Sequence, residues 1–187
     1  MAADPRMILL MSYYRDAEIR GANLLLRLMS YLTDGDSQTK LTLHLADETR
    51  HAWLWTKRMN DLGGEPLPVG DGYQSRIGLR TVPRSLIELL ALTIVVEERS
   101  LDRYIEHAAR SNVDAETMAV LKEVSHDEKW HISWIRNKLE DLAAAEEGGA
   151  EKAAAAMEKY REIDRQVYEG LLEKEREAFG GQLAHTS

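Results

Sequence analysis

The chain has 187 residues, enough for one domain with a hydrophobic core, with a formal net charge of −8 and no cysteine. The lack of cysteine excludes disulfides, thiolate nucleophiles, iron–sulfur clusters and thiolate zinc sites, so a metal site would need carboxylate and imidazole ligands. The acidic balance argues against nucleic acid as a partner, and neither a long apolar stretch nor an export-signal pattern over residues 1–11 is visible, so we expect a cytoplasmic protein without membrane contact.

The first predicted helix covers residues 7–32 and the second covers residues 37–62. In the first, apolar side chains recur at steps of three and four residues from Met11 to Leu32, which is typical of a helix with one buried face. The second shows the same period and ends at Gly63, a residue type that commonly terminates helices. These two segments are therefore predicted to form one helix pair.

Residues 63–84 hold eight of the chain's glycines and prolines and show no clear helical period. So long a connection is unusual inside a compact domain. A segment that carries the chain from one end of a helix bundle to the other would explain it. We therefore predict a crossover connection between two helix pairs.

The second half of the chain repeats this layout. Ser85 and Glu88 form a capping box at the start of a third long helix, and Asp114 can cap a fourth. A fifth helical pattern follows a pair of glycines. We predict an all-α fold in which residues 1–147 form a four-helix bundle and residues 148–187 form an additional helix and tail that packs on the bundle or on a second subunit.

One motif occurs twice, in the predicted second and fourth helices: Asp47-Glu48-Thr49-Arg50-His51 and Asp127-Glu128-Lys129-Trp130-His131. A glutamate and a histidine three positions apart lie on one helix face, so their donor atoms can bind the same metal ion. Both pairs fall inside apolar stripes, where an unpaired carboxylate would be costly or would take up a proton. A single copy would be a weak signal, but two buried copies favour a metal site over a solvated helix face.

Each motif is preceded by a glutamate in the helix before it. Glu18 stands 30 positions ahead of Glu48, and Glu97 stands 31 ahead of Glu128, so the chain is a weak internal duplication. Glu98 is an alternative to Glu97, because adjacent residues of a helix point about 100° apart and only one can face the centre. We prefer Glu97, which aligns with the apolar stripe of its helix.

The predicted metal ligands are Glu18, Glu48, His51, Glu97, Glu128 and His131. Four buried glutamates carry about four negative charges, which two divalent ions would neutralise, and the donor set suits two iron ions, with manganese or a mixed iron–manganese pair as alternatives. We expect Asp47 and Asp127 to accept the imidazole N–H of the opposite motif's histidine. Tyr14 and Tyr104 could act as redox or proton partners, and His44 as an extra ligand or proton relay, although packed core roles are commoner for all three.

These motifs resemble those of the ferritin-like di-iron carboxylate superfamily, and the resemblance covers roughly residues 8–142. The first motif fits that family's Asp/Glu-Glu-x-Arg-His pattern, whereas the second has Trp130 in place of the arginine. The resemblance implies a ferritin-like four-helix bundle with one long crossover connection over residues 63–84 and an additional C-terminal helix.

The resemblance also implies roles for the ligands. Glu48 and Glu128 would bridge the two metal ions, Glu18 and Glu97 would be terminal carboxylates, and each motif histidine would bind one metal.

Three functions are compatible with such a centre. The one we favour is an oxidoreductase of the rubrerythrin-like or oxygenase kind, which reacts with dioxygen or hydrogen peroxide and takes electrons from an external donor. The second is a ferroxidase that stores or detoxifies iron, and the third is a non-catalytic structural bundle. The segment from Glu97 to Arg103 is also similar to the third helix of tRNA-modifying di-iron hydroxylases, but the acidic charge argues against that substrate. We expect a homo-oligomer, with a dimer favoured.

Overall fold

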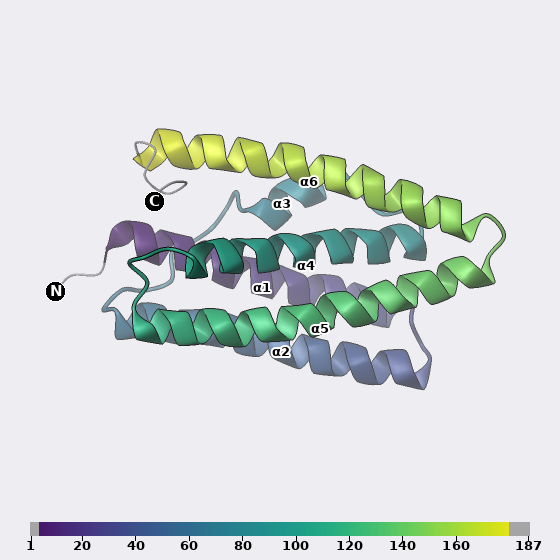
Figure 1. The fold of residues 1–187 in the computed structure, drawn as a ribbon, viewed down its shortest axis with the longest axis horizontal. Helices are drawn as coiled ribbons and strands as arrows, with labels where there is room; N and C mark the ends of the chain where they lie inside the picture. The colour runs from purple at the N-terminus through teal and green to yellow at the C-terminus, as the bar shows by residue number, and fades with distance from the viewer. Residues whose placement is uncertain (1–3, 180–187) are drawn as a thin grey trace.

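The computed structural model describes residues 4–179, with side chains described up to residue 173. It contains six helices over this range: α1 (Pro5–Met29), α2 (Gly35–Asp61), α3 (Tyr73–Arg80), α4 (Leu86–Ala108), α5 (Ala115–Ala145) and α6 (Gly149–Phe179). The four long helices α1, α2, α4 and α5 form the bundle, in which α1 packs on α2 and α4 packs on α5 (Figure 1). The part of the chain described here contains no strand, so the all-α prediction is confirmed.

The caps predicted for the third and fourth long helices are present. Ser85 Oγ accepts the backbone N–H of Glu88 at 3.2 Å at the start of α4, and Asp114 Oδ1 accepts that of Thr117 at 2.8 Å at the start of α5. Each cap satisfies a backbone donor that the first helical turn leaves without a partner. These short-range signals therefore fix where the two helices begin.

The connection between the helix pairs departs from the prediction, because it contains the short helix α3. Residues 63–84 show no clear helical period, yet Tyr73–Arg80 within them form a helix, and the predicted crossover between the two helix pairs is present. Tyr73 and Ile77, one turn apart, are both buried, and the Tyr73 hydroxyl donates to Asp164 Oδ1 of α6 at 2.6 Å. A helix of eight residues is marginal alone, so α3 owes its stability to packing against α1 and α6, which the local sequence does not display.

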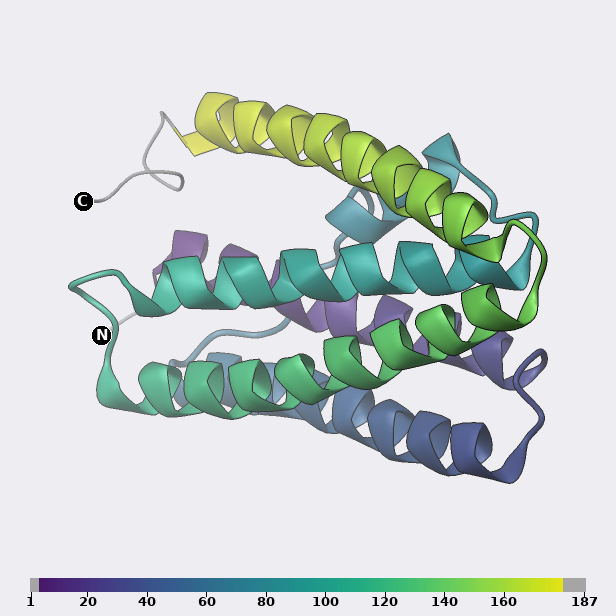
Figure 2. The ribbon, with the colours of Figure 1, turned by 45° about the vertical axis from the view of Figure 1, so that its right-hand side comes forward.

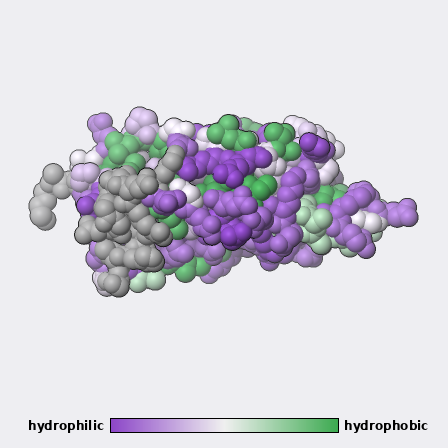
Figure 3. All heavy atoms as spheres, turned by 90° about the horizontal axis from the view of Figure 1, so that it is seen from above, coloured by the Kyte–Doolittle hydropathy of each residue, from purple (hydrophilic) through white to green (hydrophobic). Residues whose placement is uncertain are grey.

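The C-terminal helix α6 runs along the bundle and packs mainly on α4, with further contacts to α5 and α3 (Figure 2). Its buried stripe includes Tyr160, Val167 and Leu171. Arg99 of α4 donates two hydrogen bonds to Asp164 of α6, at 2.9 and 2.7 Å. Seen from the side on which α6 lies, the surface of the molecule is largely hydrophilic (Figure 3). The apolar side of α6 is therefore already buried within one chain.

The apolar core is divided into two clusters, and the division falls at the same level of all four bundle helices. One cluster contains Leu25, Leu41, Leu90 and Ile135, and the other contains Met11, Trp55, Tyr104, Leu121 and Val124. Along each helix, buried glutamates and histidines lie between the two sets. The bundle therefore has a polar layer in its middle. No helix within residues 4–179 is long and apolar enough to cross a membrane.

Candidate metal centre

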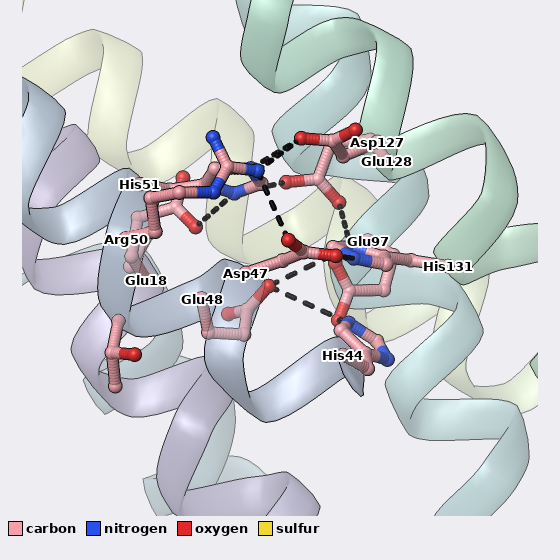
Figure 4. Close-up of polar contacts among 12 residues, drawn as sticks. Glu18, His44, Asp47, Glu48, Arg50, His51, Glu97, Asp127, Glu128 and His131 are labelled. Carbon is pink, nitrogen blue, oxygen red and sulfur yellow. Dashed lines mark hydrogen bonds and ion pairs between the residues drawn. The ribbon is translucent and has the colours of Figure 1, made fainter. Parts of the chain in front are cut away.

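The polar layer brings together the six side chains predicted as metal ligands. They are Glu18 of α1, Glu48 and His51 of α2, Glu97 of α4, and Glu128 and His131 of α5, and each is at most 3% exposed. His44 of α2 lies in the same layer and is fully buried. Figure 4 shows these side chains converging from four helices on one interior region.

The donor atoms form two groups, within each of which they lie no more than 4.8 Å apart. One group is His44, Glu48, Glu97 and His131, and the other is Glu18, Glu48, His51 and Glu128. Two neighbouring groups of three or four donors can hold two metal ions. Glu48 belongs to both groups, which is the position that a bridging carboxylate requires.

Each motif histidine is oriented by the aspartate of the other motif. His51 Nε2–H donates to Asp127 Oδ2 at 3.1 Å, and His131 Nε2–H donates to Asp47 Oδ2 at 3.3 Å. When the rings are neutral, their Nδ1 atoms therefore carry lone pairs, and these atoms face central glutamate oxygens at 3.3 and 3.2 Å respectively. This carboxylate–histidine pairing is the usual arrangement behind an imidazole that binds a metal.

A single arginine holds both orienting aspartates. Arg50 donates to Asp47 Oδ1 at 3.0 Å and to Asp127 Oδ2 at 2.5 Å, and it also pairs with Glu123 (Figure 4). The second motif has Trp130 at the corresponding position. One guanidinium thus serves both halves of the site, a sharing that the sequence did not reveal.

The structure distinguishes the two adjacent glutamates of α4. Glu97 is 3% exposed and faces the centre, whereas Glu98 lies at the surface and pairs with Arg136 at 2.5 Å. Glu97 is therefore the one of the two that can contribute to the metal centre.

Negative charge on the buried carboxylates is unfavourable unless a proton or a cation neutralises it. Burial, followed by the charges of neighbouring glutamates, raises the pKa of Glu48 and Glu128 well above the ordinary value. The Oε1 atoms of both carboxylates are buried and have no hydrogen-bond partner. Unpaired buried oxygens carrying charge are costly, and divalent cations would neutralise them. The residues present therefore fit a pair of divalent metal ions.

The two tyrosines predicted near the site differ in their relation to it. The Tyr104 hydroxyl donates to a carboxylate oxygen of Glu18. Tyr14 packs against Tyr104 and Trp55, with ring centroids 5.0 and 4.9 Å apart, and its hydroxyl lies 3.3 Å from Nδ1 of His107. His107 is fully buried, although nothing in the sequence indicated more than a surface position for it.

Gly21 of α1 provides space for the carboxylate of Glu48. A Cβ atom at position 21 would overlap Glu48 Oε2. The role of Gly21 could not be predicted from the sequence, because a glycine inside a helical pattern shows only that a side chain is missing and not which group occupies the space.

We expect Gly21→Ala to displace the Glu48 carboxylate and to weaken metal binding by about tenfold or more. The fold should be retained, because alanine favours the helix by about 1 kcal/mol over glycine. Metal titration and thermal unfolding measure the two effects separately. Gly170→Ala in α6 is the matched control, since its Cβ would meet only Arg76 at 3.9 Å. Unchanged metal affinity in Gly21→Ala would show that the Glu48 position is not required.

Comparison with known proteins supports the fold. No protein-family model matches the sequence, and no curated protein is significantly similar to it. Among solved structures, the chain is similar to bacterioferritin BfrA of Mycobacterium tuberculosis, with a TM-score of 0.63 and 20% identity over 83% of this chain and 96% of that one. It is also similar to the bacterioferritin-related protein of Bacteroides fragilis, described as a dodecameric thioferritin, with a TM-score of 0.62 and 21% identity over 75% of this chain and 88% of that one.

Fold and site together define a ferritin-like helical bundle with buried carboxylate and histidine groups suited to metal ions. The chain has the same ferritin-like fold as these two structures, which is the fold that the resemblance implied.

Proposed function

We propose that the chain binds two iron ions in this centre and acts as a ferroxidase, oxidising ferrous iron with dioxygen or hydrogen peroxide. The observation that carries this proposal is the burial of six converging ligands, none more than 3% exposed. Ions, dioxygen and peroxide are small enough to reach such a centre. Two ferrous ions bound there would supply the two electrons that, with two protons from water, reduce dioxygen to hydrogen peroxide or hydrogen peroxide to two water molecules.

The chain's own residues have distinct tasks in this proposal. Glu48, which belongs to both groups of donors, would compensate the charge of both ions. Glu97 would compensate one ion and Glu18 and Glu128 the other, and the motif histidines would complete the two sites through Nδ1. The aspartates and the shared arginine hold the imidazoles in the tautomer that offers Nδ1.

The oxidoreductase that the sequence analysis favoured, acting on a separate substrate with an external electron donor, is less well supported. A larger organic substrate would need the bundle helices to move apart to reach the buried ligands. The similar solved structures are a bacterioferritin and a bacterioferritin-related protein, which also favours iron oxidation and storage.

Anaerobic titration with ferrous iron, followed by exposure to dioxygen or peroxide, tests the proposed function. We expect about two ferrous ions bound per chain and ferric absorbance that appears faster than in protein-free buffer. Repeated additions that are oxidised and retained would indicate storage. Binding without any acceleration would refute the ferroxidase, and rapid peroxide reduction sustained by an added electron donor would instead favour the oxidoreductase.

We also propose that the chain forms a homo-oligomer. Several large apolar side chains are exposed on α1, α2 and the turn between them: Ile19, Leu26, Tyr31, Leu43 and Trp53. Exposed apolar surface of this kind favours association. Light scattering of the purified protein should give a mass of at least two chains, and it distinguishes the dimer favoured from the sequence from a larger assembly.

A further inference from the structure

His44 is the one histidine in the polar layer that lies outside the two motifs. It lies one turn before Glu48, while the corresponding residue before Glu128 is the apolar Val124, so only one half of the duplication carries it. Its ring stacks on His131 with centroids 3.6 Å apart and lies edge-on to Trp134 at 5.9 Å. The imidazole is therefore held in one place by its neighbours.

Trp134 determines which nitrogen of His44 carries the proton. The indole Nε1–H of Trp134 donates to His44 Nδ1 at 3.2 Å. Because an indole nitrogen can only donate, Nδ1 must offer a lone pair, and the proton of the neutral ring is on Nε2. The Nε2 atom lies 3.4 Å from Glu97 Oε1 and 3.5 Å from Glu48 Oε1, and it forms no regular hydrogen bond with either oxygen. Hydrogen bonds in binding sites often tighten only when the ligand binds, so contacts of this length are compatible with a donor role for Nε2.

This arrangement is the reverse of the one around the motif histidines. His51 and His131 each donate Nε2–H to an aspartate and keep a lone pair on the nitrogen that faces the centre. His44, by contrast, accepts a hydrogen bond from Trp134 at Nδ1 and has its N–H at Nε2, the nitrogen nearer the central glutamates. A nitrogen that carries a proton has no lone pair for a metal ion, so proximity to the other donors does not make His44 a ligand.

We propose that His44 is a hydrogen-bond donor to the carboxylates of Glu97 and Glu48, fixed in this role by Trp134, and not an additional metal ligand. Tyr104 does the same for Glu18 on the other side of the centre. Glu18 and Glu97 thus each have one neutral donor, which is the phenol of Tyr104 for Glu18 and the imidazole of His44 for Glu97. The two metal positions therefore differ in their surroundings although their ligand sets are similar.

The inference deepens the proposed function, yet it can be tested without iron or oxidation. Nitrogen-15 NMR of histidine-labelled, metal-free protein reports which ring nitrogen is protonated. We expect His44 to be the Nε2–H tautomer, and we expect that proton to remain after Zn²⁺, a diamagnetic probe, is added. Finding Nδ1–H in the metal-free protein, or loss of the Nε2 proton on Zn²⁺ binding, would overturn the inference. Failure to bind Zn²⁺ would count against the metal centre, while the metal-free spectrum would still decide the tautomer.

Two variants at position 44 separate a donor from a ligand. The amide N–H of glutamine can replace the imidazole Nε2–H, so His44→Gln should keep Zn²⁺ affinity within about threefold. Leucine has no donor, so His44→Leu should weaken binding by about tenfold or more, in the range seen when residues that support metal ligands are removed. Equal losses in both variants would indicate that His44 is itself a ligand.

Replacing the residue that fixes the tautomer gives an independent test. Trp134→Phe keeps an aromatic ring but removes the N–H, so the His44 proton becomes free to occupy Nδ1 and the single-tautomer NMR signature should be lost. Trp55→Phe is the matched control, because the indole nitrogen of Trp55 is buried and has no hydrogen-bond partner. An unchanged His44 signature in Trp134→Phe would contradict the role assigned to Trp134.

Discussion

Replacing Glu48 by alanine is expected to lower metal binding from about two ions per chain to less than one. Glu48 is the residue whose carboxylate belongs to both groups of donors, so its loss removes an anionic ligand from each. The charge of both ions would then be under-compensated, and affinity should fall by more than the 10- to 100-fold that losing a supporting residue costs. Metal analysis of variants purified and reloaded under identical conditions measures the change.

Two neighbouring glutamates of α4 provide graded comparisons for this variant. Glu97 belongs to one group only, so Glu97→Ala should retain about one ion per chain. Glu98, adjacent to it but paired with Arg136 at the surface, should tolerate alanine with both ions retained. Circular dichroism confirms that each variant remains helical. Full occupancy in Glu48→Ala would show that the donors do not bind metal as the geometry indicates.

In the metal-free protein, the contribution of Glu48 and Glu128 to the free energy of unfolding is expected to fall as the pH rises. Burial and neighbouring charges raise the pKa of Glu48 and Glu128 well above 4.5, so the folded state binds these protons more tightly than the unfolded state. Their contribution is fully present below pH 4.5 and is lost as pH rises through the folded pKa values. Between pH 4.5 and the folded pKa of each group, the free energy of unfolding falls by about 1.4 kcal/mol per pH unit for that group.

The buried histidines determine where this effect can be observed. Burial lowers the pKa of His131 to about 3 and that of His107 to about 4, so their contributions increase with pH and are complete above about pH 7. Burial alone would lower the pKa of His51, but its bonds to Glu18 and Asp127 raise it, and its contribution is lost as pH rises through that raised value. Comparison with a variant that lacks both carboxyl groups therefore separates their contribution from that of the histidines.

Urea unfolding of metal-free and Zn²⁺-loaded protein at a series of pH values from about 5 to 9 measures this dependence. We expect the contribution of Glu48 and Glu128 to fall across this range in the metal-free protein and to fall much less in the loaded protein, because cations replace the protons as partners of the carboxylates. Glu48→Gln combined with Glu128→Gln is the control, since neutral amides of the same shape should reduce the slope in the metal-free protein. The same pH dependence in the metal-free wild type and in the metal-free double variant would contradict the raised carboxyl pKa values.

Several features of the site followed from the sequence because they depend on local periodicity. A repeated Glu-x-x-His inside an apolar stripe places two donors on a buried helix face, whatever the details of packing. The upstream Glu18 and Glu97 lie at nearly equal distances from their motifs, which indicated a shared interior. The expected pairing of each aspartate with the opposite histidine, Asp47 with His131 and Asp127 with His51, agrees with the contacts in the structure.

The sequence by itself determined the helix pairs, their capping residues and the set of donors that could enter the middle of the bundle, since these depend on spacing along one chain segment. Only the tertiary structure decided that α3 forms and that Arg50 pairs with the aspartates of both motifs. It also decided that Gly21 leaves space for the Glu48 carboxylate and that Trp134 donates to Nδ1 of His44. These features depend on the axial and rotational placement of neighbouring helices. That placement results from packing between distant segments, which no local pattern specifies.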